Sequence, residues 1–343
     1  MTVSVLRLPD IHERWPFPIT YNRWEDPVSA ETLAWLESLS ILSAAELKKY
    51  RAGINFCNFS SMAYAHFADM EHFRVGCDLL NLLFVLDDIT DKMSAAEARR
   101  ISVISLDGLR NWEIPRPSGE HPAGEMHRRQ GYSFSARLHR VASSDVLARF
   151  MANYELYLKA VINEADERDR NVVRPSFDTY LTLRRETGAV IMCFDLLLVP
   201  AEIPDSILND ARVARVERLG LDLICVGNDI LSFNVEQARK ATHNAVVVVM
   251  HEHGLSVQDA MDFVGRWYCQ TVEEFLEAMR DVPPCDSVII RTRVKMYFAA
   301  IANWVTCNYE WSLRSGRYFA ADQDPQESGW IVPLLETDCN PEN

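Results

Sequence analysis

Acidic side chains gather at the end of a long apolar segment in the first third of the chain. The segment 77–91 runs through several leucines to Asp87, Asp88 and Asp91. On a helix, Asp87 and Asp91 share one face and Asp88 lies on its flank. Carboxylates crowded at a helix C-terminus repel each other and the helix dipole, so a bound Mg²⁺ would stabilise them. A solvated helix end is the alternative, and this short motif does not decide between the two.

A second group of oxygen-bearing side chains lies much further along the chain. Asn228, Ser232 and Glu236 are spaced four residues apart, which places them in one stripe on a helix. The preceding residues 219–226 are mostly apolar, so this helix should be buried, where an unsatisfied polar stripe costs free energy. A hydrogen-bond network between helices would satisfy the stripe, but metal binding is favoured. A diphosphate bridged by several Mg²⁺ ions would use both acidic sites.

Two further sites supply cations that could bind a diphosphate. Arg184 and Arg185 lie in a largely apolar segment, 180–188, and Arg317 is followed by Tyr318. Guanidinium groups bind phosphate oxygens through two parallel hydrogen bonds, and a phenol can donate another. A surface salt bridge is the alternative for each arginine.

The elements that must position these residues are helices. Ser43, Ser94 and Ser256 each precede an acidic residue by three positions, which predicts a capped helix start. The β-branched run 245–250 could form a strand, but no partner strand is apparent, so we expect a buried helix. His251-Glu252-His253-Gly254 has the wrong spacing for a zinc site and predicts a helix end. We therefore expect one all-α bundle of ten or more helices at 26–318, with an extended arm at 1–25 and a partly mobile tail at 319–343.

Composition excludes several classes of function. The 35 Lys and Arg against 49 Asp and Glu give a net charge of −14, which disfavours binding to nucleic acid or to anionic membranes. No apolar run approaches the ~18–20 residues of a membrane span, and no signal peptide is apparent. The eight cysteines form no CxxC pair, which is typical of reduced, mostly buried thiols in a cytoplasmic protein. The thiol of Cys339 is one residue too far from the end for a prenylation motif.

Taken in order, the aspartate cluster, the arginine pair, the Asn228/Ser232/Glu236 stripe and Arg317-Tyr318 resemble the microbial class I terpene synthases. The context is closest to the sesquiterpene synthases of basidiomycete fungi, and the resemblance runs from Leu8 to Tyr318. It implies a helical bundle with a central active-site cavity, three Mg²⁺ ions and a prenyl diphosphate substrate, expected to be farnesyl diphosphate. The sequence leaves open whether the protein is a monomer or a homodimer.

The resemblance also implies roles for individual residues. Asp87 would be the main ligand of two metal ions, supported by Asp88 and Asp91. The stripe on residues 228–236 would hold the third ion. One departure is Val235, because many relatives carry Lys at this position, and this removes one expected diphosphate contact.

Further implied roles concern the diphosphate. Arg185 would sense the diphosphate, with Arg184 as the alternative after a shift of one residue. The segment 187–189 would form the helix break that triggers ionisation, and Arg317 and Tyr318 would bind the diphosphate.

The expected reaction is Mg²⁺-dependent loss of diphosphate and cyclisation of the resulting carbocation. Aromatic faces can stabilise such a cation, and Phe84, Trp304 and Phe56 are the candidates, each with core packing as its alternative. A prenyl chain-elongating transferase of the same fold would carry two aspartate-rich motifs, so the Asn/Ser/Glu stripe favours cyclisation. A non-catalytic all-α binding protein would leave both acidic sites unexplained.

Overall fold

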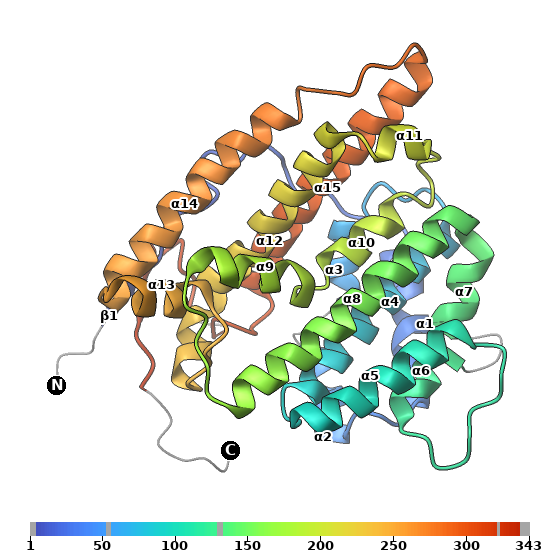
Figure 1. The fold of residues 1–343 in the computed structure, drawn as a ribbon, viewed down its shortest axis with the longest axis horizontal. Helices are drawn as coiled ribbons and strands as arrows, with labels where there is room; N and C mark the ends of the chain where they lie inside the picture. The colour runs from blue at the N-terminus through green and yellow to red at the C-terminus, as the bar shows by residue number, and fades with distance from the viewer. Residues whose placement is uncertain (1–4, 53–55, 129–132, 321–322, 337–343) are drawn as a thin grey trace.

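The protein is a bundle of helices with almost no sheet (Figure 1). The structure is a computed structural model that describes residues 5–52, 56–128, 133–320 and 323–336. Within these ranges the chain forms fifteen α-helices, one 3₁₀ helix and two short strands. The predicted all-α bundle is confirmed. No helix in the described residues is long and apolar enough to cross a bilayer.

The elements follow one another along the chain in this order: β1 Val5–Arg7, α1 Glu25–Ser38, α2 Ala44–Ala52, α3 Phe56–Ala63, α4 Met70–Thr90, α5 Ala95–Arg110, η1 Pro122–Gly124, α6 Glu125–Arg128, α7 Phe134–Val141, α8 Ser144–Asp169, α9 Phe177–Thr187, α10 Val190–Leu197, α11 Asp205–Leu208, α12 Ala211–Ala238, α13 Ala245–His253, α14 Val257–Ala278, α15 Val288–Arg314 and β2 Ile331–Pro333.

The local signals that predicted helix ends are found in the structure. Ser94 and Glu97 form a complete capping box at the start of α5, and Ser256 caps α14. Ser43 accepts a hydrogen bond from the backbone N–H of Glu46 at the start of α2. The β-branched run forms α13, as predicted, and this helix ends at Gly254 with a left-handed φ of 64°.

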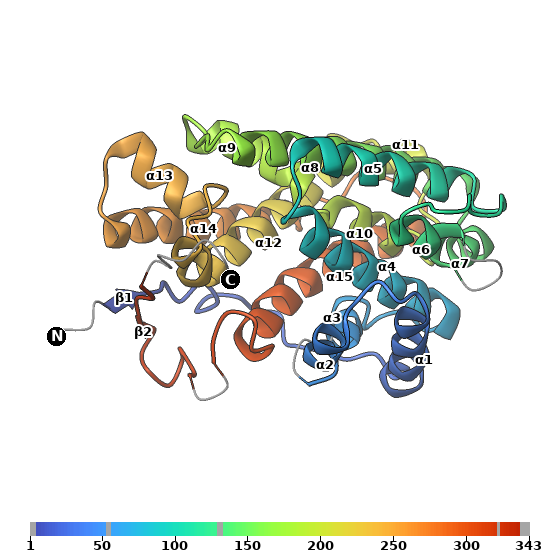
Figure 2. The same cartoon turned by 90° about the horizontal axis from the view of Figure 1, so that it is seen from below.

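The long helices α12 and α15 pack against each other in the middle of the bundle. The helix α12 also packs against α13 and α14, and α15 packs against α3. Figure 2 shows α5, α8 and α9 on one side of these central helices and α1 to α3 on the other. Burial of large side chains such as Phe194, Phe233, Phe275 and Trp304 fixes this arrangement, because apolar area removed from water is the main favourable term in folding.

The two ends of the described chain meet on one side of the bundle (Figure 2). The strand β1 pairs antiparallel with β2, with Leu6 opposite Val332. The backbone N–H of Leu8 donates to the carbonyl of Trp330 at 2.8 Å. The arm thus contains a strand whose partner lies in the tail. The boundaries proposed for arm, bundle and tail stay predictions.

The seven cysteines in the described part of the chain form no disulfide with one another, in agreement with the predicted reduced thiols. Five of them are buried: Cys57, Cys77, Cys193, Cys225 and Cys307. Cys339 lies outside the described residues.

Candidate active site

The stripe of oxygen donors lies on α12. Ser232 is fully buried, and among the described residues its hydroxyl has no partner in a regular hydrogen bond. Asn228 donates to the phenol oxygen of Tyr318 at 2.9 Å. Glu236 accepts a hydrogen bond of 2.9 Å from Asn244, and burial, followed by the nearby charge of Asp229, raises its pKa to about 7. A carboxyl buried beside a second acidic residue is a site that a cation would stabilise.

The aspartate cluster lies at the C-terminal end of α4. Asp91 is the C-cap residue, and its N–H donates to the carbonyl of Asp87. Desolvation, followed by the negative charge of Asp91, raises the pKa of Asp87 to about 7. Its side chain keeps 49% of its surface exposed, so water screens part of this effect. Desolvation, followed by the charge of Glu164, raises the pKa of Asp91 to about 6, and water screens this effect too because 60% of the side chain is exposed. Arg168 lies 3.7 Å from its carboxylate.

Arg317 and Tyr318 connect the two acidic sites. The guanidinium of Arg317 lies 3.8 Å from Asp87 and 3.6 Å from Asp88, both on α4. The adjacent Tyr318 accepts the hydrogen bond from Asn228 on α12. Residues far apart in sequence therefore meet around two neighbouring side chains. This is the arrangement in which one polyanion could contact both acidic sites through bridging cations.

The two arginines of α9 have different partners. Arg184 donates to Asn228 at 2.8 Å and to Asp229 at 3.0 Å, so it lies against the oxygen stripe. Arg185 forms two hydrogen bonds, 2.6 and 2.9 Å long, with Asp222. Consecutive helical residues point about 100° apart, so only one of them can face the stripe. The contacts favour Arg184, the alternative that the sequence left open, over Arg185 as the residue next to the site.

A break in the helix lies about one turn after Arg184. The helix α9 ends at Thr187, and α10 begins at Val190. Ala189 between them has a left-handed φ of 58°, an uncommon conformation for a residue with a Cβ. A Cβ added to Gly188 would lie 2.6 Å from the sulfur of Cys225 on α12, so only glycine fits there. The break lies at the segment 187–189 that the sequence indicated.

Aromatic rings gather beside Asp87. Phe84 stacks on Phe56 with ring centroids 3.8 Å apart, and the guanidinium of Arg317 lies 5.4 Å from the Phe84 ring. Trp304 is buried and contacts the edge of Phe59 at 5.5 Å. All three predicted aromatic residues therefore belong to one connected group of rings.

Sequence reasoning missed further members of this ring group, among them Phe59 and Trp311. Trp311 contacts Phe59 at 5.1 Å, Phe84 at 5.5 Å and Tyr318 at 6.3 Å between centroids. A signal existed in the sequence, because Trp304 and Trp311 are seven residues apart and so share a face of one helix.

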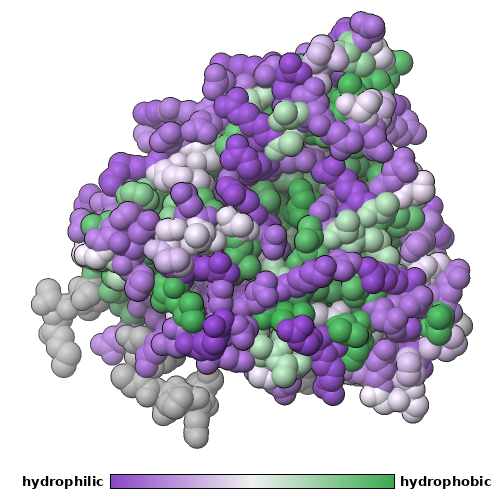
Figure 3. All heavy atoms as spheres, in the orientation of Figure 1, coloured by the Kyte–Doolittle hydropathy of each residue, from purple (hydrophilic) through white to green (hydrophobic). Residues whose placement is uncertain are grey.

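A hollow of about 70 Å³ lies beside Trp311. It is smaller than the ~300–1,000 Å³ of typical small-molecule sites, so it is not the central cavity expected from the resemblance. Its lining consists of Tyr21, Asn58, Met62, Glu310, Trp311, Arg314 and Ser315. Figure 3 shows apolar side chains in the middle of the face seen in Figure 1, with hydrophilic ones around them.

The donor set fits a hard divalent cation. Carboxylate, amide and hydroxyl oxygens are ligands that Mg²⁺ accepts, and the hydroxyl of Ser232, which makes no hydrogen bond of regular geometry, could serve as one. In the described part of the chain, no group of three or more His, Cys, Asp or Glu side chains could hold a metal ion alone. Water and phosphate oxygens would therefore have to complete the coordination of any ion bound here.

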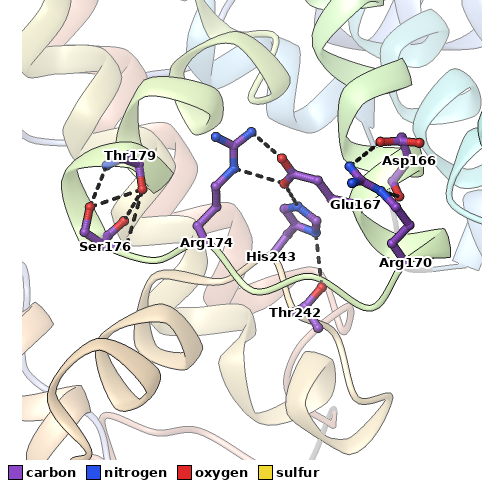
Figure 4. Close-up of polar contacts among 8 residues, drawn as sticks. All are labelled: Asp166, Glu167, Arg170, Arg174, Ser176, Thr179, Thr242 and His243. Carbon is purple, nitrogen blue, oxygen red and sulfur yellow. Dashed lines mark hydrogen bonds and ion pairs between the residues drawn. The ribbon is translucent and has the colours of Figure 1, made fainter.

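An ion-pair cluster holds the loop that follows the stripe (Figure 4). Glu167 on α8 accepts hydrogen bonds from Arg174 at 3.0 Å and from His243 at 2.8 Å, and Thr242 lies 3.3 Å from the other ring nitrogen of His243. Arg174 precedes α9, whereas His243 precedes Asn244, the partner of Glu236. The cluster thus fixes the loop between α12 and α13 against α8.

Residues 78–274 match the family described as terpene synthase family 2, C-terminal metal binding. This span contains the aspartate cluster, the arginine pair and the stripe. It ends before Arg317 and Tyr318.

Curated proteins of basidiomycete fungi are similar over almost the whole chain. A Delta(6)-protoilludene synthase of Stereum hirsutum is 34% identical over 92% of this chain and 84% of its own length. The sesquiterpene synthase Agr9 of Cyclocybe aegerita is 34% identical over 91% and 82%. Sesquiterpene synthase 9 of Postia placenta is 34% identical over 97% and 95%.

Solved structures share the fold at lower identity. The structure of α-eudesmol synthase matches with a TM-score of 0.77 and 24% identity, over 88% of this chain and 98% of that one. Hedycaryol synthase in complex with nerolidol matches with a TM-score of 0.69 and 21% identity, over 89% and 100%. These matches identify the helical architecture of class I terpene synthases.

Proposed function

Because this chain belongs to the terpene synthase family, we propose that it is a sesquiterpene synthase that ionises farnesyl diphosphate and cyclises the carbocation. The curated relatives that support this substrate class are named as sesquiterpene or protoilludene synthases. The family description includes metal binding, and we infer that the metal is Mg²⁺ and that three ions bind.

One observation carries the proposal: Arg317 and Tyr318 touch the aspartates of α4 and the stripe of α12 at the same time. A diphosphate bound at this point would meet a guanidinium, a phenol and two sets of oxygen ligands. Neither site has enough oxygen ligands to complete the coordination of a metal ion. The oxygens of a diphosphate placed between the two sites would complete it for ions at both.

The chain's own groups would stabilise the leaving diphosphate. Asp87, Asp88 and Asp91 would hold metal on one side, and Asn228, Ser232 and Glu236 on the other. Bound Mg²⁺ would neutralise the charge that develops on the diphosphate. Arg184 and Arg317 add fixed positive charge, which costs no reorganisation during ionisation.

The ring group beside Asp87 would then hold the cation. Phe84 lies one helical turn before Asp87, so its face is close to the point where the allylic carbon loses diphosphate. Phe59 and Trp311 contact the Phe84 ring, and Trp304 contacts Phe59. This apolar surface would exclude water, which would otherwise end the reaction early.

A chain-elongating transferase is less well supported, because α12 carries the Asn228/Ser232/Glu236 stripe in place of a second aspartate-rich motif. A cytoplasmic location and a monomeric or homodimeric state stay predictions from the sequence.

The purified chain should be incubated with Mg²⁺ and each of geranyl, farnesyl and geranylgeranyl diphosphate, with and without isopentenyl diphosphate. Gas chromatography–mass spectrometry should detect a sesquiterpene hydrocarbon or alcohol from farnesyl diphosphate alone. EDTA should abolish it. A longer prenyl diphosphate, formed only when isopentenyl diphosphate is present, would support the transferase instead. No terpene product from any substrate would exclude the proposal.

A further inference from the structure

Side-chain amides close both edges of the two-stranded sheet. On the outer edge, Gln258 of α14 accepts from the N–H of Arg7 at 2.9 Å and donates to its carbonyl at 3.0 Å. On the inner edge, Asn234 of α12 donates to the carbonyl of Pro333 at 2.8 Å and accepts from the N–H of Leu335 at 3.0 Å. Each amide makes one donor and one acceptor bond to backbone, as a neighbouring strand would. The sheet therefore forms a continuous link from α14 to α12.

Further contacts fix the tail against α12. The amide of Gln237 donates to the carbonyl of Leu335 at 2.8 Å and to that of Asn234 at 3.2 Å. Val332 is only 4% exposed, whereas the neighbouring Ile331 is 42% exposed. The tail thus has one buried face and one solvent face at this point, and its buried face lies on the bundle.

Asn234 lies on the face of α12 opposite the stripe. Asn234 lies two residues from Ser232 and two from Glu236, so it points about 200° away from the stripe. Its exposed fraction is 7%. At the last turns of α12, the tail therefore packs on one face of the helix, and the stripe residues lie on the opposite face.

Glu236 lies close to the end of its helix, which is Ala238. The last turn of a helix lacks internal partners for its carbonyl groups and frays readily. A metal ligand, in contrast, must be held within about 0.5 Å of its productive position. Contacts on the opposite face of α12 would provide this constraint.

We propose that the sheet formed by β1 and β2 holds the end of α12 in place through Asn234, and so positions Glu236 for metal binding. Asn234 is a positioning residue here and touches no substrate. The statement about metal rests on the proposed function, whereas the bracing of α12 does not. The same segment is anchored to α12 a second time, because Tyr318 binds Asn228. The chain after α15 therefore contacts α12 near both ends of the stripe.

Four variants of the full chain separate this proposal from a general loss of stability. Asn234→Ala removes the inner amide, and Val332→Asp places a charge on the buried face of the tail. Ile331→Asp is the matched control on the solvent face. Gln258→Ala is the matched control for the amide, since it opens the outer edge of the same sheet without touching α12.

Hydrogen exchange of the metal-free protein provides a measurement that does not depend on activity. We expect amides in the peptide 232–241 to exchange about tenfold faster in Asn234→Ala and Val332→Asp. The two controls should change this rate less than about twofold. In the double variant Asn234→Ala/Val332→Asp, exchange should be no faster than in the more affected single variant, because both changes break the same contact between the tail and α12. Unchanged exchange in Asn234→Ala would overturn the proposal.

Metal binding is then measured by the rise in melting temperature on adding Mg²⁺ and inorganic diphosphate. The Mg²⁺ concentration for half the rise should increase about tenfold in Asn234→Ala and stay unchanged in the controls. If Asn234→Ala fails to fold, Asn234→Asp keeps the acceptor for Leu335 and loses the donor to Pro333, and a smaller increase of the same sign is expected. An increase of equal size in Gln258→Ala would contradict a specific role for Asn234. A wild-type protein without turnover but with the expected exchange would refute the proposed function and leave the bracing of α12 intact.

Discussion

Arg184 donates a hydrogen bond of 2.8 Å to the side-chain oxygen of Asn228. That oxygen is the atom through which Asn228 would bind a metal ion. Arg184 and the proposed metal ion would therefore share this oxygen, and Asp229 accepts a second hydrogen bond of 3.0 Å from the same guanidinium. We expect a metal ion bound to Asn228 to compete with Arg184 for this oxygen.

The neighbouring arginines allow a paired test of this relationship. Arg184→Lys keeps a charge near Asp229 and loses the planar fork, so kcat should fall about 10²-fold. Arg185→Lys should lower kcat less than about threefold, because Arg185 pairs with Asp222, away from the stripe. Steady-state kinetics with farnesyl diphosphate checks both. A larger loss in Arg185→Lys would reverse the assignment.

Removal of either proposed ligand set should stop the reaction without unfolding the protein. We expect Asp87→Ala and Asn228→Ala each to lower turnover at least about 10³-fold, since the leaving group then loses charge stabilisation. Circular dichroism should show unchanged helix content. Full activity of either variant would contradict its role as a ligand.

Two buried serines distinguish a metal ligand from a core residue. Ser232 and Ser312 are both fully buried, and the hydroxyl of each lacks a regular hydrogen-bond partner among the described residues. Replacing either by Ala should change the melting temperature of the metal-free protein little, because neither hydroxyl makes a hydrogen bond of regular geometry. Only Ser232→Ala should increase the half-saturating Mg²⁺ concentration, by about tenfold. Equal metal dependence of the two variants would exclude Ser232 as a ligand.

Phe84 should act through its aromatic face. Phe84→Leu preserves apolar volume but removes the ring, so the loss of about 2 kcal/mol of cation stabilisation should lower kcat about 30-fold. Phe84→Tyr keeps a ring and should retain most of the activity. Product analysis by gas chromatography–mass spectrometry should show more acyclic alcohol in Phe84→Leu. An unchanged rate and product in that variant would reduce Phe84 to a packing role.

The pH dependence should follow the raised pKa of Glu236. Since this pKa is about 7 and a metal ligand must be deprotonated, the half-saturating Mg²⁺ concentration should fall as the pH rises from about 6 to 8. In the metal-free protein, the folded state keeps a proton that the unfolded state loses near pH 4.5, so this group destabilises the fold increasingly between about pH 4.5 and 7.

The stability part of this prediction is tested against Glu236→Gln. The melting temperature of the wild type should fall relative to that of the variant as the pH rises from about 5 to 7.5. Buried histidines such as His127, whose pKa burial lowers to about 3, act with the opposite sign in both proteins, and their effect cancels in the difference. A difference that is constant with pH would refute the raised pKa.

Local features of the chain were determined by the sequence itself. The spacing of Asn228, Ser232 and Glu236 defines a stripe on any helix, because 3.6 residues per turn is a local property. The same holds for the cap at Ser94 and for the glycine that ends α13. The β-branched run could be assigned to a helix because a single strand has no hydrogen-bond partners of its own.

The tertiary structure decided what depends on residues far apart in sequence. Whether Arg184 or Arg185 faces the stripe is set by how α9 packs on α12. Because both residues are arginine, the sequence cannot distinguish them. The pairing of β1 with β2, the hold of Asn234 on the tail and the place of Trp311 among the rings all join distant segments. Their free energy comes from contacts that no local window contains, so periodicity reveals the faces of the helices and only packing determines which faces meet.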